Sequence, residues 1–599
     1  MTRLLAGGLV VAALGASVPA PAPPPRLRAV VEDLGIPRTD RAVQARVVLG
    51  DLLLATVFET KGTARLVVVD LKTGAQEEVP LPGCTGGDAL VADETHGAAW
   101  IGTSMAAAVW RFDAATRRAE RVAALDPFLA RERYVWSLAL GPGGRLYAGT
   151  YPSGLLLLHD PARGISKSLG PAMAGRQYLR DLLVGPSGTV YCGLGTPAAL
   201  VAYEPPTGRF TDLLPGKRSS SPIAVNLRLE DGRLHSNLGA IVVAEPAAAV
   251  VPPAGAVVRL EPDGRYEVRR GPERFAGRID LAPKQEGMGT MGLGLGPEGA
   301  IYGATYYNAS LFRVDPGTGA TTSLGRVVDA DGEFRVIQDI GGGRVLLPGY
   351  TGVLFVYEPG RPWGADNPRR LGSLGNRQHL ATAADRDQRG VVAIATPPDY
   401  GSRGGALSLF DPATLAWRTF VSLVPDQSMT AVCLGPLGRL YGGSSVEVGL
   451  GETVRARAAR LVAVDVATGR TVADLVPVPQ ATAITALVAL DDRRVLGGTD
   501  SGQLFVYNAR TGRSRLVADV AHVRGLAWWP RRGVVLGIGW RRGLFTVDPQ
   551  SLEVAWIEGS PARLMPGLAF DAHDRVYVHD GTRVLRVSVS SAAPASAQE

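Results

Sequence analysis

An internal repeat constrains the fold of this chain more than any other feature, and its clearest copy spans residues 136–170. Apolar runs at 137–140, 145–149, 155–159 and 165–169 are separated by the turn sequences GPGG, YPSG and DPARG. Short apolar runs between clusters of Gly, Pro and Asp are typical of β-strands joined by tight turns. The repeat therefore predicts a four-stranded antiparallel unit.

Copies of this unit fill most of the chain. About twelve copies recur at intervals of roughly 40–48 residues, within the range typical of propellers and solenoids. A propeller blade is one four-stranded sheet, and a single propeller holds about 4–8 blades. The repeat therefore predicts an all-β fold of tandem β-propellers with about twelve blades; a β-solenoid is the alternative, but its coils are usually shorter. The copies begin near residues 47, 90, 136, 181, 225, 291, 336, 381, 430, 484, 526 and 568.

The chain has 599 residues, which is too long for a single hydrophobic core. An even division into six and six blades assigns 31–332 to the first propeller and 333–590 to the second. Division into seven and five blades, with a border near 366–371, is the alternative. If an N-terminal strand completes the last blade, the two propellers are not consecutive segments of the chain. Two insertions, 240–256 and 446–459, are both expected between the second and third strands of a blade.

The N-terminus predicts a secreted or periplasmic protein. A positive start at Met1-Thr2-Arg3, an apolar run over 4–16 and the small residues Val18-Pro19-Ala20 predict a signal peptide at 1–20. An uncleaved anchor is the alternative. We expect a proline-rich linker at 21–30 and a disordered tail at 591–599.

Composition excludes several classes of partner. The net charge of +7 is spread over the whole chain without a compact Lys/Arg run, which argues against a nucleic-acid partner. No later apolar run is long enough to cross a membrane, so no membrane insertion is expected, and we expect a monomer. Three cysteines, Cys84, Cys192 and Cys433, cannot form a disulfide framework. Cys192 and Cys433 lie in apolar strands and are predicted to be buried and unpaired.

Strand direction in a blade assigns its loops to two faces. The loop before the first strand and the loop between the second and third strands emerge together, on what we call the variable face. Aromatic and basic residues of this face are the candidate ligand-binding residues, since aromatic rings stack on sugars and Arg binds carboxylate or sulfate. Packing between blades is the alternative role. The candidates are Tyr134, Trp136, Tyr151, Arg176, Gln177, Tyr178, Arg180, Tyr306, Tyr307, Tyr350, Arg377, Gln378, His379, Tyr400 and Trp540.

The doubled element Arg-Gln-aromatic, at 176–178 and 377–379, predicts a basic, aromatic-lined funnel in each propeller. The function predicted is binding of an acidic carbohydrate or cell-wall polymer. If the protein is an enzyme, a polysaccharide lyase or glycosidase is expected, with His379, Tyr400 and Tyr178 as proton-transfer candidates and Arg to neutralise a uronate. A non-catalytic interaction scaffold is the alternative. No metal-ligand or hydrolase motif is found, so neither metal nor cofactor is expected.

The pattern GPxGxLYxGT followed by DPxTG resembles secreted bacterial propeller repeats of the YVTN and quinoprotein-like kind. The resemblance covers nearly the whole chain and implies a propeller fold. The tryptophan-rich docking pattern and the cofactor-holding residues of quinoprotein dehydrogenases are absent from the sequence, so the resemblance implies no quinone cofactor. Some propeller lyases and glycosidases use Tyr, His and Arg on this face, but only the residue types match.

Overall fold

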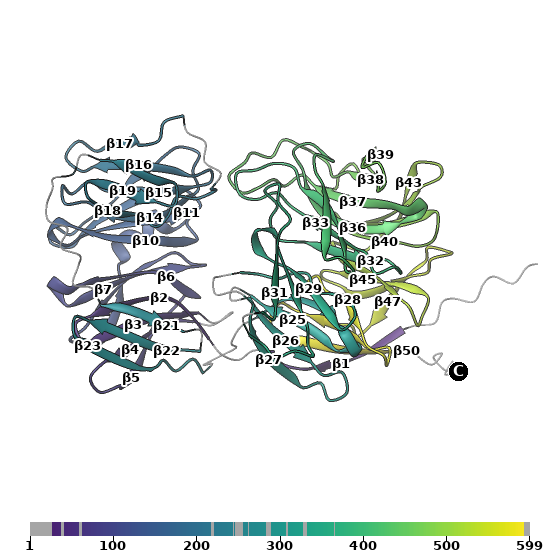
Figure 1. The fold of residues 1–599 in the computed structure, drawn as a ribbon, viewed down its shortest axis with the longest axis horizontal. Helices are drawn as coiled ribbons and strands as arrows, with labels where there is room; N and C mark the ends of the chain where they lie inside the picture. The colour runs from purple at the N-terminus through teal and green to yellow at the C-terminus, as the bar shows by residue number, and fades with distance from the viewer. Residues whose placement is uncertain are drawn as a thin grey trace, which may run out of the picture.

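The structure is a computed structural model that describes residues 27–37, 41–58, 63–216, 221–243, 245, 256–261, 263–282, 289–306, 309–327, 332–364 and 366–591. It consists of two rings of antiparallel sheets that lie side by side (Figure 1), which confirms tandem β-propellers. Helices in the described residues are limited to short turns: α1 (Asp126–Leu129) and the 3-10 turns η1 (Glu94–His96), η2 (Ala123–Leu125), η3 (Pro142–Gly144), η4 (Pro297–Gly299), η5 (Tyr350–Gly352) and η6 (Pro436–Gly438).

The first propeller has six blades in the described part of the chain, of which the last two have three strands each. The strands, blade by blade, are β2 (Ala42–Leu49), β3 (Leu52–Phe58), β4 (Ala64–Asp70) and β5 (Gln76–Leu81); β6 (Gly86–Asp93), β7 (Ala98–Ser104), β8 (Val109–Asp113) and β9 (Arg118–Arg121); β10 (Tyr134–Gly141), β11 (Arg145–Tyr151), β12 (Leu155–Asp160) and β13 (Ile165–Pro171); β14 (Tyr178–Val184), β15 (Val190–Gly195), β16 (Ala199–Glu204) and β17 (Arg209–Asp212); β18 (Arg228–Glu230), β19 (Arg233–Ser236) and β20 (Gly239–Val242); β21 (Val257–Leu260), β22 (Arg265–Arg270) and β23 (Glu273–Arg278).

The second propeller has seven blades, again counted over the described residues. The strands are β24 (Thr290–Leu295), β25 (Ile301–Thr305), β26 (Ser310–Val314) and β27 (Thr321–Arg326); β28 (Gln338–Gly341), β29 (Arg344–Pro348), β30 (Val353–Tyr357) and β31 (Arg369–Ser373); β32 (Ala383–Arg386), β33 (Val392–Thr396), β34 (Ala406–Asp411) and β35 (Ala416–Phe420); β36 (Ser428–Gly435), β37 (Arg439–Ser445), β38 (Leu461–Asp465) and β39 (Thr471–Leu475); β40 (Ile484–Ala489), β41 (Arg494–Thr499), β42 (Gln503–Asn508) and β43 (Arg513–Asp519); β44 (Val523–Trp529), β45 (Val534–Gly539), β46 (Gly543–Val547) and β47 (Val554–Glu558); β48 (Ala569–Phe570), β49 (Val576–His579), β50 (Val584–Ser591) and β1 (Leu27–Asp33).

The N-terminal strand β1 belongs to the second propeller. It pairs antiparallel with β50 along its full length, from Leu27 opposite Ser591 to Asp33 opposite Leu585. In Figure 1 this strand, in the colour of the N-terminus, lies beside β50. A single cluster of apolar side chains from β24–β26 and β48–β50 then closes the ring.

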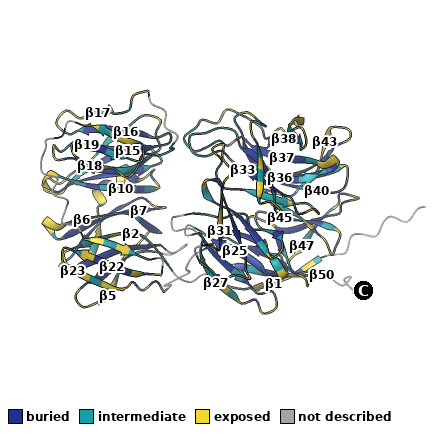
Figure 2. Cartoon of the chain, viewed as in Figure 1, coloured by how far each residue is buried: buried dark blue, intermediate teal, exposed yellow. Residues whose placement is uncertain are grey.

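Apolar side chains between neighbouring blades form the core of both propellers, and Figure 2 shows burial concentrated in the strands. In the second propeller such clusters link every blade to the next. In the first, the cluster that includes Leu53, Val67, Tyr266 and Val268 joins β21–β23 back to β2–β5. Each blade therefore buries its faces only by ring closure, as expected for a propeller.

Several predicted boundaries differ from this arrangement. Strands β24–β27 pack against β48–β49 and β28, so the second propeller begins near residue 290 instead of 333. Residues 27–30, predicted as linker, form part of β1, because β50 would otherwise leave an open sheet edge. The insertion at 240–256 begins in β20 and ends before β21, so it separates two blades, whereas 446–459 lies between β37 and β38 as predicted. The signal peptide and nearly all of the predicted tail lie outside the described residues.

All three cysteines are buried and free, which confirms the prediction for Cys192 and Cys433. Burial raises the pKa of both thiols, so neither has the thiolate character of a catalytic cysteine.

Two buried carboxylates, one in each ring, each accept a hydrogen bond from a backbone amide of the next blade. The Leu227 backbone amide donates to Asp181 Oδ2 at 2.9 Å, and the Leu434 amide donates to Asp385 Oδ2 at 2.8 Å. Burial raises the pKa of Asp181, and it raises the pKa of Asp385 to about 6. Burial of these carboxyl groups therefore costs stability when they are ionised.

We expect Asp385→Asn to stabilise the second propeller at neutral pH. The folded-state pKa of Asp385 lies above its unfolded value, so the folded state binds the proton more tightly. The stability of the wild type should therefore fall as pH rises from about 4 to about 6 and should stay at the lower value above that range. The Asn variant should match the wild type near pH 4 and exceed it by on the order of 1–3 kcal/mol at pH 7.5 in urea unfolding. Asp492→Asn, at a carboxylate that is 81% exposed, is the control, and equal destabilisation of Asp385→Asn at both pH values would contradict the expectation.

Candidate functional site

Three innermost strands of the first propeller, β6, β10 and β14, share a backbone irregularity that places side chains at the channel. The pairing register shifts between Gly87 and Ala89, between Val135 and Ser137, and between Leu179 and Asp181. The residues inside these shifts are Asp88, Trp136 and Arg180. β-Bulges re-aim side chains next to binding sites, and here all three bulge residues line one cavity.

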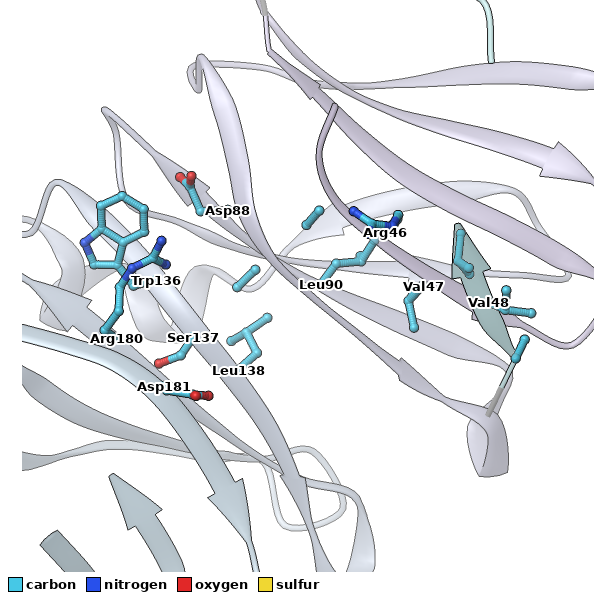
Figure 3. Close-up of a pocket in the computed structure, with 14 residues that line it drawn as sticks. Arg46, Val47, Val48, Asp88, Leu90, Trp136, Ser137, Leu138, Arg180 and Asp181 are labelled. Carbon is cyan, nitrogen blue, oxygen red and sulfur yellow. The ribbon is translucent and has the colours of Figure 1, made fainter. Parts of the chain in front are cut away.

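This cavity lies in the channel of the first propeller and has a volume of about 530 Å³. Figure 3 shows Trp136 beside Arg180 at one wall and Arg46 across the opening. The volume is within the range of small-molecule sites, and apolar side chains with a few charged groups are typical of such sites. The residues that line the cavity are Ala45, Arg46, Val47, Val48, Asp88, Ala89, Leu90, Trp136, Ser137, Leu138, Arg180, Asp181, Ala256 and Val258.

Polar groups of the cavity are partly committed to the protein and partly available. The Arg180 guanidinium stacks 4.1 Å from the centre of the Trp136 ring, and no carboxylate lies within 4 Å of it among the described residues. The Trp136 indole Nε1 is buried and has no hydrogen-bond partner among the same residues. Asp88 Oδ1 accepts a hydrogen bond of 3.2 Å from Gln44 Nε2. The wall around Trp136 therefore offers a guanidinium without a carboxylate partner among the described residues, beside a buried indole N–H that has no partner there either.

Aromatic rings continue from Trp136 across the variable face of the first propeller. Tyr134 stacks on Trp136 at 4.5 Å between ring centres, and Tyr151 stacks on Tyr178 at 4.4 Å. Tyr134 also contacts Tyr151 edge-on at 5.8 Å. Blades β10–β13 and β14–β17 thus present a continuous group of four rings.

A second group of rings belongs to the second propeller and meets the first. Its ring centres, those of Tyr350, His379 and Tyr400, lie within 6.4 Å of one another. The Tyr350 and Tyr400 hydroxyl groups share a hydrogen bond of 2.7 Å. The Tyr178 ring lies 6.3 Å from the Tyr400 ring. We call these seven residues the aromatic seam: Tyr134, Trp136, Tyr151, Tyr178, Tyr350, His379 and Tyr400. The prediction of a separate funnel in each propeller is therefore wrong for these residues, because the variable faces of the two rings meet.

Further contacts hold the variable faces together around the seam. The Thr196 hydroxyl donates to the Leu450 carbonyl oxygen, so the insertion at 446–459 reaches the first propeller. The ring centres of Phe58 in the first propeller and Tyr306 in the second lie 6.2 Å apart. These contacts fix the seam between two rigid rings, which is a common place for ligand sites.

The seam is a low-dielectric environment. Burial raises the pKa of Tyr134 to about 12 and also raises the pKa values of Tyr178 and Tyr400. Burial lowers the pKa of His379, whose Nε2 lies 4.0 Å from Asp399 Oδ1 and has no hydrogen-bond partner among described residues. At neutral pH the phenols are therefore protonated and the imidazole is uncharged. Of these groups only His379 can accept a proton there.

Other predicted residues have different surroundings. Gln378 is buried, its Oε1 accepts from Thr396 Oγ1 at 2.8 Å and its Nε2 donates to the Asn376 carbonyl oxygen at 3.0 Å, so its amide is used within the fold. Arg377 donates to the Tyr400 carbonyl oxygen at 2.8 Å and thereby holds the Tyr400 loop. Trp540 has no ring contact with the seam among the described residues, and Tyr307 lies outside them.

Arg176 and Gln177 lie at the edge of blade β14–β17, just before its innermost strand. Arg176 Nε and Gln177 Oε1 are both buried without a hydrogen-bond partner in the described part of the chain. Both atoms remain available for a polar contact, in contrast to the Gln378 amide.

Sequence reasoning missed Arg46, Asp88 and Asp181 in the cavity, and Glu333 beside the seam. Burial raises the pKa of Glu333, and Arg335 lies 3.6 Å from its carboxylate. A signal for Asp88 was present: each bulge residue stands two positions before a repeated Leu, as in DAL at 88–90, WSL at 136–138 and RDL at 180–182. Glu333 had no such signal in the sequence.

No protein-family model and no curated protein sequence matches the chain. Among solved structures, streptogramin B lyase is 9% identical and aligns over 50% of this chain and 94% of its own, with a TM-score of 0.40. PorZ, a surface component of the type-IX secretion system of Porphyromonas gingivalis, is 13% identical over 92% of this chain and 86% of its own, with a TM-score of 0.38. The extracellular domain of a B. thetaiotaomicron protein described as a one-component system is 10% identical over 93% and 82%, with a TM-score of 0.35. These likenesses are too distant to transfer a residue or an activity.

The described residues contain no helix that is both long and apolar enough to span a bilayer. Within the same residues, no group of three or more His, Cys, Asp and Glu side chains is arranged to hold a metal ion.

Proposed function

We propose that this protein binds an acidic saccharide at the cavity of the first propeller and the adjoining aromatic seam. The main support for the proposal is that the cavity and the seam are continuous: Trp136 lines the cavity and also stacks on Tyr134 of the seam. A run of rings beside a concave site suits sugars, which present flat C–H faces to aromatic side chains and hydroxyl groups to polar atoms.

The charged groups support the acidic character of the ligand. Arg180 is held flat on Trp136 and has no carboxylate partner in the described part of the chain. Arg46 also lines the cavity without an ion pair among described residues, and it is exposed to solvent. A guanidinium binds a carboxylate through two parallel hydrogen bonds, and the fixed position of Arg180 lowers the entropy lost on binding.

Binding is better supported than proton transfer. Tyr178 and Tyr400 have raised pKa values, so phenolate is disfavoured as a base at neutral pH. Tyr178 is also packed against Tyr151 and Tyr400. His379 is the one proposed proton acceptor with a suitable uncharged form, and it would act with Asp399 nearby. Hydrolysis or elimination is therefore a secondary proposal that depends on His379.

Trp136→Ala should weaken binding of a uronate oligosaccharide about tenfold. The substitution removes the ring that joins the cavity to the seam and the surface on which Arg180 rests, and a central aromatic contact contributes at least about 1–2 kcal/mol. A glycan array on the wild type would identify the ligand, and titration calorimetry would compare the variants. Arg180→Gln should reduce affinity for the uronate oligosaccharide by about tenfold or more. Its affinity for an oligosaccharide that lacks the carboxylate groups should change little.

Trp528→Ala is the matched control, because Trp528 is 38% exposed on β44 of the other propeller. It should bind as the wild type does. If the wild type binds no saccharide on the array, or if Trp136→Ala binds with unchanged affinity, the proposal is wrong. Capture of a protein partner through the seam would then favour the scaffold alternative.

A further inference from the structure

A second group of arginines lies on the variable face of the second propeller, on blade β44–β47 and the loop that follows it. We call Arg524, Arg541, Arg542 and Arg563 the arginine patch. None of the four has a carboxylate oxygen within 4 Å among the residues that the structure describes, whereas many other arginines of the chain form such pairs. Arg541, Arg542 and Arg563 are exposed.

Backbone hydrogen bonds gather the patch from three loops. The Trp540 amide donates to the His522 carbonyl oxygen at 2.9 Å, and the Arg563 amide donates to the Trp540 carbonyl oxygen at 2.7 Å. The Arg542 amide closes the turn on Gly539 at 3.1 Å. The four cations are therefore attached to one fixed backbone frame, although 39 residues separate Arg524 from Arg563.

Two of the guanidinium groups are held on tryptophan rings. Arg524 lies 4.3 Å from the centre of the Trp540 ring, and Arg542 lies 4.2 Å from the centre of the Trp556 ring. Stacking of this kind orients a planar guanidinium and leaves its N–H edges free to bind an oxyanion. The patch is thus preorganised for anions.

The opposite end of the same blade provides an internal comparison. There Arg532 stacks on Trp529 at 4.4 Å, but its Nε also donates to Asp574 Oδ2 at 2.9 Å. Among the described residues, the fold supplies a carboxylate to that Arg–Trp pair and none to the two pairs on the variable face. An arginine without an internal carboxylate partner is what a site for an external anion requires.

Arg524 has the strand position that lines the cavity in the first propeller. The register of β44 shifts between Val523 and Gly525, so Arg524 is the bulge residue of its blade, as Asp88, Trp136 and Arg180 are of theirs. Its Nε is buried and has no hydrogen-bond partner among the described residues. Burial alone lowers the pKa of Arg524, in agreement with the lack of a carboxylate beside it.

We propose that the arginine patch is a binding site for the sulfate or carboxylate groups of an anionic polysaccharide, separate from the cavity and the seam. Four cations on one backbone frame, two of them held on tryptophan rings, match a polymer with several anionic groups. Single-stranded nucleic acid fits less well, because it needs free aromatic faces for its bases, and guanidinium groups already occupy a face of Trp540 and of Trp556.

The test uses the full chain and two saccharide probes of equal charge, a heparin oligosaccharide and an oligogalacturonate. Arg542→Gln combined with Arg563→Gln removes two exposed charges without touching a core residue. The double variant should lose at least about tenfold in affinity for whichever probe the wild type binds, and the salt dependence of binding should become less steep. The probe that binds identifies sulfate or carboxylate as the recognised group.

Arg531→Gln is the matched control, since Arg531 is exposed on the same blade at the opposite face. It should bind normally. The loss caused by Arg542→Gln with Arg563→Gln should also be found in a Trp136→Ala background, which separates this proposal from that for the seam. No binding of either probe by the wild type, an unchanged affinity in the double variant, or an equal loss in Arg531→Gln would overturn the proposal. Tighter binding of single-stranded DNA of equal charge, lost in the double variant, would also overturn it and assign the patch to nucleic acid.

Discussion

A chain that begins at residue 34 should have a second propeller destabilised by on the order of 3–5 kcal/mol relative to a chain that begins at residue 27. The deletion removes β1 and exposes the edge of β50 over seven residues, from Leu585 to Ser591. It also removes Glu32, whose carboxylate lies 2.6 Å from the largely buried Arg586 guanidinium. Loss of one partner of a buried ion pair costs about 3–5 kcal/mol, although the exposure of Glu32 favours the lower end.

Calorimetry and hydrogen exchange would measure this effect. The melting temperature of the second propeller should fall by roughly 10 °C, at about 2–4 °C for each kcal/mol. Amide protection should be lost first in β49 and β50, while β10–β13 of the first propeller stay protected. Equal melting of the two chains, or equal loss of protection in both propellers, would contradict closure by β1.

Arg41→Ala should destabilise the first propeller by about 3–5 kcal/mol. The Arg41 side chain is 1% exposed, and its NH2 group donates to Glu78 Oε1 at 2.6 Å and to the Asp280 carbonyl oxygen at 2.8 Å. Glu78 lies on β5 of the first blade and Asp280 follows β23 of the last, so one guanidinium joins the two ends of the ring. The substitution leaves a cavity and removes the closest cation from Glu78.

Urea unfolding and hydrogen exchange of β2–β5 and β21–β23 would measure the effect of Arg41→Ala. Arg46→Ala is the matched control, because Arg46 lies in β2, which begins directly after Arg41, is exposed and has no ion pair among the described residues. It should change stability by less than about 0.5 kcal/mol. A loss confined to the second propeller, or a loss no larger than that of Arg46→Ala, would show that Arg41 does not hold the ring closed.

The local unit of this fold was predictable from the sequence. Turn residues and apolar runs placed four strands in 136–170, and the ends of β10–β13 differ from the predicted ends by at most three residues. These signals are local: Gly and Pro set the turns, and alternation sets the buried face. The same reasoning placed Tyr134, Tyr178 and Tyr400 on the variable face, because strand direction alone assigns loops to faces.

Ring membership was decided by tertiary structure. Strand β1 lies next to β50 although more than 550 residues separate them, and β24–β27 join the second ring instead of the first. Every blade has similar apolar faces, so the sequence pattern fits several divisions equally well. Only the closing contacts, such as Arg586 with Glu32 and Arg41 with Asp280, distinguish among them.

The sequence by itself determined the repeat, the strand pattern within each blade and the residue types on the variable face, because these depend on interactions within about forty residues. The tertiary structure alone decided that Tyr178 and Tyr400 share one seam, that Gln378 is used inside the fold and that Arg524 has no carboxylate partner among the described residues. Each of these depends on which distant side chain comes within a few ångströms, and that is fixed only when both rings close and their variable faces meet.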